Sequence, residues 1–168
     1  MVMRLIFDDC LGYVRHGRTP FQGLATRPAS QVAAEHFPAL MPNREQIVEL
    51  LSPRYAAAWG EDQDYRYCIL RTIFDDLPSR GPGLLGVRPP GFVARVTERA
   101  VAEGFTERSP ENEFSFIVIN TWSEPDTGHD SGPLRPVRFN MIPSDISADG
   151  SLADAGLMVM GGPPLGRP

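Results

Sequence analysis

Seventeen prolines and sixteen glycines recur along this 168-residue chain and limit the length of every helix and strand. Proline removes a backbone donor and blocks helix interiors and central strands, and glycine weakens both kinds of element. The densest run of the two residues, 78–91, is therefore interpreted as an internal linker. Since the length suits one hydrophobic core, we expect a single globular domain over residues 1–168, with a loose tail at about 162–168.

Four short helices are predicted between these breaks. Ser30 and Asn43 are favourable N-cap residues, and each precedes a short segment that a proline ends or interrupts. Residues 92–101 have apolar side chains at helical spacing, and Gly104 is placed to end that helix in a left-handed conformation. The predicted helices span 30–37, 43–51, 55–59 and 92–101.

Five segments are predicted to be strands, because they combine short apolar runs with β-branched and aromatic side chains. The clearest alternation lies in 135–142, where Val137, Phe139 and Met141 share one face while Arg138 and Asn140 share the other. The predicted strands span 3–7, 10–14, 65–74, 114–121 and 135–142. The expected fold class is α+β: a small, largely antiparallel sheet covered on one face by three or four short helices, with long Pro/Gly-rich loops.

Composition excludes several classes of protein and cofactor. No apolar run is long enough to span a bilayer, and the N-terminal segment lacks the layout of a secretory signal, so we expect a cytoplasmic protein. The sixteen basic residues are all arginines and the net charge is −5, which argues against nucleic acid as a partner. Cys10 and Cys68 are expected to be reduced core residues, and the scattered histidines predict neither a metal site nor any other cofactor.

Residues 13–19 contain the tripeptide Arg15-His16-Gly17. This motif resembles the Arg-His-Gly signature of the histidine phosphatase superfamily. The resemblance implies a phosphoryl-transfer enzyme in which His16 is the nucleophile and Arg15 binds the phosphate. The family also uses a second arginine and a second histidine, for which Arg71 and His129 are the candidates, although Arg71 falls in a predicted strand and aspartate follows His129.

The preferred hypothesis is instead a non-enzymatic protein-binding module, such as an inhibitor or immunity-type protein or a subunit of a larger assembly. Potentially reactive side chains are expected to be dispersed, so no catalytic residue is assigned. Aromatic and arginine side chains dominate the energetics of protein interfaces. The predicted binding residues, for another protein or for self-association, are Trp59, Tyr65, Trp122, Arg135 and Arg138.

Overall fold

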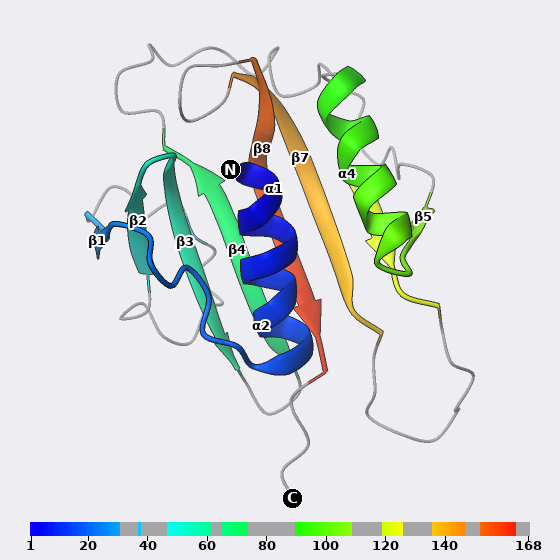
Figure 1. Ribbon diagram of the computed structural model, residues 1–168, viewed down its shortest axis with the longest axis horizontal. Coiled ribbons are helices and arrows are strands. Elements are labelled where there is room, and N and C mark those ends of the chain that lie inside the picture. The colour runs from blue at the N-terminus through cyan, green and yellow to red at the C-terminus, as the bar shows by residue number, and fades with distance from the viewer. Residues whose placement is uncertain are drawn as a thin grey trace, which may run out of the picture.

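Eight strands form one antiparallel sheet in the computed structural model (Figure 1), which describes residues 1–30, 37, 47–61, 65–73, 90–108, 119–125, 136–146 and 152–163. The strands are β1 (Thr26–Pro28), β2 (Ile47–Leu51), β3 (Arg54–Glu61), β4 (Arg66–Thr72), β5 (Thr106–Arg108), β6 (Asn120–Ser123), β7 (Arg138–Ile146) and β8 (Leu152–Gly162). Their order across the sheet is β1-β2-β3-β4-β8-β7-β6-β5. The C-terminal strand β8 is therefore central, between β4 and β7.

The N-terminal segment is one continuous helix, formed by α1 (Val2–Arg4), the π-helical turn η1 (Leu5–Cys10) and α2 (Leu11–His16). Figure 1 shows this helix lying across β4 and β8, which α2 contacts. The two strands predicted at 3–7 and 10–14 are therefore wrong. A short apolar run fits either element by itself, but buried residues four apart, such as Ile6, Cys10 and Val14, follow a helical face.

The helix α4 (Pro90–Ala102) confirms the prediction for 92–101. It buries Phe92, Val93 and Val96, and Gly104 follows it with φ +89°. Both helices pack on the same face of the sheet and share one hydrophobic core with it. Within the described part of the chain, no helix is long and apolar enough to cross a membrane.

The expected fold class is wrong, because the described residues form a larger sheet with fewer helices on it than predicted. The helices predicted at 43–51 and 55–59 are replaced by β2 and β3, which form a hairpin with Leu51 opposite Arg54. The cap residues and the apolar spacing favoured helices in these two segments. The tertiary structure outweighs this local preference, because the hairpin lets both strands bury side chains in the sheet. Residues 31–36 of the first predicted helix and residues 78–89 of the predicted linker lie outside the described residues, and α4 begins within the remainder of that linker.

The strand predictions succeed in the middle of the sheet. Segment 65–74 contains β4, and segment 135–142 contains the start of β7. Val137, Phe139 and Met141 are buried while Arg138 and Asn140 are exposed, as their alternation predicted. The predicted pairing of 114–121 with 135–142 is confirmed for Asn120 and Thr121, which pair with β7 as part of β6. β6 continues through Trp122 and Ser123, which were predicted to begin a loop, and residues 114–118 lie outside the described residues.

A disulfide joins the N-terminal helix to the centre of the sheet. Cys10 of η1 and Cys68 of β4 are fully buried, with 5.4 Å between their Cα atoms and 1.93 Å between their sulfur atoms. The prediction of two reduced thiols is therefore wrong. The two cysteines are 58 positions apart, and the sequence does not indicate that they pair. They come together only when the helix packs across β4.

Buried Glu49 on β2 holds the edge strand β1 and the segment that follows it. Its carboxylate accepts hydrogen bonds from the Arg27 Nε atom at 2.7 Å and from the Ser30 backbone N–H at 2.8 Å. Burial alone raises the pKa of Glu49, but the hydrogen bonds from Ser30 and Arg27 outweigh it and hold the pKa below its ordinary value. Ionised Glu49 therefore stabilises the folded state.

The substitution Glu49→Gln is expected to remove an acid-sensitive part of the stability. Because folding lowers the pKa of Glu49, its contribution is present above the ordinary value of 4.5 and is lost as the pH falls through the folded-state pKa. Urea unfolding at about pH 7 should show the variant less stable by about 1 kcal/mol, and the gap should shrink at about pH 3. A gap that stays constant with pH would contradict this role for Glu49.

Candidate functional site

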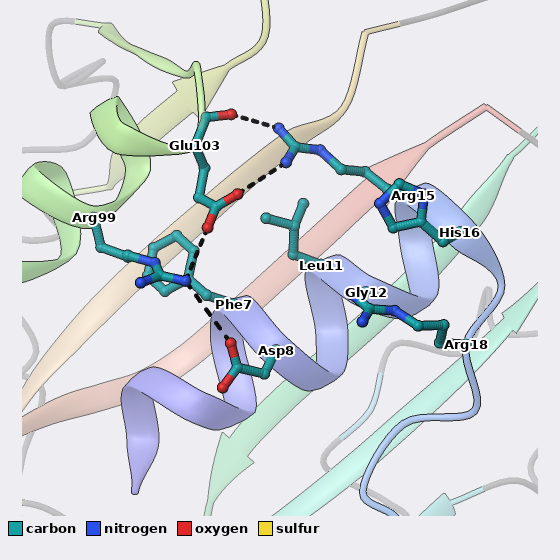
Figure 2. A pocket seen from close by; sticks show the side chains of 9 residues that line it. All are labelled: Phe7, Asp8, Leu11, Gly12, Arg15, His16, Arg18, Arg99 and Glu103. Carbon is teal, nitrogen blue, oxygen red and sulfur yellow. Dashed lines mark hydrogen bonds and ion pairs between the residues drawn. The ribbon is translucent and has the colours of Figure 1, made fainter.

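A pocket of about 150 Å³ lies between the N-terminal helix and α4, on the helical face of the sheet. Figure 2 shows its lining, in which guanidinium groups reach in from α2, from the chain after α2 and from α4. The lining residues are Phe7, Asp8, Leu11, Gly12, Arg15, His16, Arg18, Arg99 and Glu103. The accessible surface of this pocket is almost entirely polar.

Arg15 uses every nitrogen of its guanidinium group to hold other elements. Its Nε donates to Glu124 Oε1 at 2.7 Å, and its Nη2 lies 2.6 Å from the same oxygen. Its Nη1 donates to Glu103 Oε2 at 3.2 Å, and Nη2 also donates to the Glu103 carbonyl at 2.8 Å. The guanidinium group also lies 4.9 Å from the centre of the Phe105 ring. Arg15 therefore ties the end of α2 to the segments that follow α4 and β6.

Arg99 lies on the α4 side of the pocket, where two carboxylates balance its charge only in part. Its Nη2 lies 2.9 Å from Glu103 Oε1, one helical turn away, and 3.9 Å from Asp8 Oδ1 on η1. About half of the Arg99 side chain is exposed, so its pairing with Asp8 is weak. The guanidinium group also covers the Phe7 ring at 5.8 Å.

Arg18 and His16 form the open side of the pocket. Both are exposed, and within the described residues neither side chain makes a hydrogen bond or an ion pair. The Arg18 guanidinium group lies against Gly12, where an added Cβ would come within 2.7 Å of Nη2. Gly17 directs the chain out of α2 with φ +68°, a conformation that favours glycine, and so turns Arg18 back over the helix.

The expected dispersion of reactive side chains is wrong at this pocket, because His16 and Arg15 of the sequence motif meet Arg99 from a distant helix. Arg18 and Arg99 were not singled out from sequence. The only local signal for Arg99 was its spacing of four from Glu103, which is common on solvated helices.

The rest of the arrangement differs from the one that the phosphatase resemblance implies. His16 ends a helix rather than a strand, and Arg15 already pairs with two glutamates. Arg71 shares the strand face of Tyr67 and Ile69, opposite to the face that packs the helices, and burial lowers its pKa. His129 lies outside the described residues, so its position is not part of this comparison.

The predicted partner-binding residues separate into core and surface. Trp122 is fully buried, stacks on Phe139 with ring centres 4.6 Å apart, and therefore has no exposed surface. Trp59 is half-buried and packs edge-on against Phe21 at 5.4 Å. Tyr65 and Arg138 remain exposed, whereas Arg135 lies outside the described residues.

Among the described residues, no group of three or more histidine, cysteine, aspartate or glutamate side chains is placed to hold a metal ion. No protein-family model matches the chain, and comparison with curated proteins and with solved structures finds no significant match.

Proposed function

We propose that this protein is a non-enzymatic protein-binding module that uses one exposed end of the sheet face opposite α2 and α4, here called the Tyr65 face. It comprises Tyr65, Tyr67, Arg138 and Gly161. The observation that carries the proposal is that Tyr65 and Arg138, 73 positions apart in sequence, come to the same face and the same end of the sheet.

Strand register places the members of the Tyr65 face side by side. Tyr67 on β4 lies opposite Gly161 on β8, and Gly161 lies opposite Arg138 on β7. The Tyr65 and Tyr67 rings are 5.9 Å apart, which extends the row beyond the start of β4. An added Cβ at Gly161 would meet only the Arg66 carbonyl, at 3.7 Å, so glycine leaves a low point between tyrosine and arginine.

The chemistry of the Tyr65 face suits a protein partner. Tyrosine and arginine provide large contact areas with polar ends, and both are enriched among residues that dominate binding energy. Tyr65 is 36% exposed and Arg138 is exposed, while Tyr67 is buried beside them and can support the tyrosine ring. A rigid sheet beneath these side chains reduces the entropy lost on binding.

The use of arginine elsewhere supports a binding role over catalysis. Arg15 and Arg27 pair with glutamates, and buried Arg66 pairs with Glu61 and donates to the Tyr13 carbonyl at 3.2 Å. These guanidinium groups join the helix and edge strand to the sheet. An inhibitor or immunity-type protein, or an assembly subunit, needs such a fixed surface and no reacting group.

The test compares Tyr65→Ala/Arg138→Ala with the control Arg95→Ala/Val101→Ala, whose residues are exposed on α4. The wild-type chain is expected to self-associate in sedimentation experiments or to retain a protein of fixed stoichiometry from its source cells. The Tyr65-face variant should weaken that complex at least about tenfold, while the control leaves it unchanged.

Two outcomes would reject the proposal. One is a wild-type chain that stays monomeric and retains no protein. The other is equal binding by the Tyr65-face variant and the control, with both variants shown to be folded by circular dichroism.

The cytoplasmic location stays a prediction from the sequence, and the disulfide argues against it. Disulfides form and persist mainly in oxidising environments, whereas cytoplasmic thiols are usually kept reduced. The Cys10–Cys68 bond therefore argues for an oxidising compartment.

A further inference from the structure

We propose that the pocket between the N-terminal helix and α4 binds a carboxylate group, with Arg18 as its principal ligand. This site lies on the helical face of the sheet and is separate from the Tyr65 face. It is also separate from any phosphoryl chemistry, since the proposal requires no bond to form or break.

The first argument is the charge of the lining. The carboxylates of Glu103, Glu124 and Asp8 lie against Arg15 and Arg99, whose charges they balance. Arg18 adds a further guanidinium group to the lining, and no carboxylate of the described residues pairs with it. A carboxylate ligand would pair with Arg18.

The second argument is the availability of Arg18. Arg15 uses its nitrogens on Glu103 and Glu124, and Arg99 is paired with Glu103. Arg18 makes no ion pair or hydrogen bond with its side chain among the described residues, yet it is positioned by contact with Gly12. A guanidinium group in this state can offer two parallel N–H donors to one carboxylate.

The third argument concerns which anion fits. His16 lines the same pocket and can donate a hydrogen bond from its ring. Asp8 and Glu103 line the same pocket and would repel a second negative charge, which disfavours a phosphate dianion. A volume of about 150 Å³ admits a carboxylate on a short stem, such as a small organic acid or an aspartate side chain.

The experiment titrates the ¹⁵N-labelled full chain with sodium acetate and, separately, with a capped peptide that contains one aspartate. Sodium chloride at matched ionic strength and the corresponding asparagine peptide are the controls. The amides of Gly17 and Arg18 should shift in a saturable manner with the carboxylates alone. Arg18→Ala should weaken binding about tenfold or more, whereas Arg95→Ala on the exposed side of α4 should stay within about twofold of wild type.

The two carboxylate arms identify the source of the ligand. Binding of the aspartate peptide about tenfold tighter than acetate supports a protein ligand, and equal affinities support a free organic acid. The proposal is overturned if neither carboxylate gives saturable shifts, if Arg18→Ala binds as well as Arg95→Ala, or if inorganic phosphate binds more tightly than both carboxylates. These outcomes are independent of the Tyr65 face, whose variants should leave the titration unchanged.

Discussion

Replacing Trp122 with alanine is expected to reduce the free energy of unfolding by about 3–5 kcal/mol. The indole is fully buried and stacks on Phe139, with ring centres 4.6 Å apart and an angle of 17° between the planes. Its Nε1–H donates to Thr97 Oγ1 at 3.3 Å, which links β6 to α4. Removal of the ring therefore opens a cavity between the sheet and α4. Equilibrium unfolding in urea measures the loss.

Trp59→Ala is the matched comparison, because Trp59 is only half-buried and should cost clearly less. A loss below about 1 kcal/mol for Trp122→Ala would contradict its place in the core. The comparison also determines how partner-binding experiments are read. A binding defect in Trp122→Ala would reflect loss of the fold, so Tyr65 and Arg138 are the informative positions.

Loss of the Cys10–Cys68 disulfide is expected to destabilise the chain by about 2–4 kcal/mol. The bond closes a loop of 58 positions and ties the N-terminal helix to β4, so it restricts the unfolded chain strongly. Urea unfolding of Cys10→Ala/Cys68→Ala, compared with the oxidised wild type, measures the effect. Thiol titration of the denatured wild type, without reductant, should find no free thiol.

The control for this prediction is a reductant. Reduction should shift the unfolding transition of the wild type and leave that of Cys10→Ala/Cys68→Ala unchanged. Two free thiols in protein purified under oxidising conditions would contradict the bond. The bond also fixes the helix that lines the pocket between the N-terminal helix and α4, because Leu11, Gly12 and Arg15 follow Cys10 on that helix.

Segments with a one-sided pattern were predictable from sequence. The alternation around Phe139 and the helical spacing after Phe92 each survive folding, because one face of the element meets the core and the other meets solvent. Shorter segments were not. The run Leu5–Ile6–Phe7 is apolar in either conformation, and only its packing into the core on the sheet selects the helix.

The candidate site was likewise predictable only in part. Arg15 and His16 are neighbours in the sequence motif, and both line the pocket. Arg99 reaches that pocket from α4, so its role required knowledge of how the two helices pack on one sheet face. Arg71, chosen as a partner for His16, lies on the opposite face, because side chains alternate along β4.

The chain by itself determined the acidic balance, the amphipathic α4 and the alternation of β7, because these depend on residue type and local spacing. Tertiary structure alone decided that the N-terminal segment is a helix, that Cys10 meets Cys68, and that Tyr65 and Arg138 share a face. The physical reason is that these features depend on contacts between residues distant in sequence, whose free energy is gained only when the whole sheet has assembled.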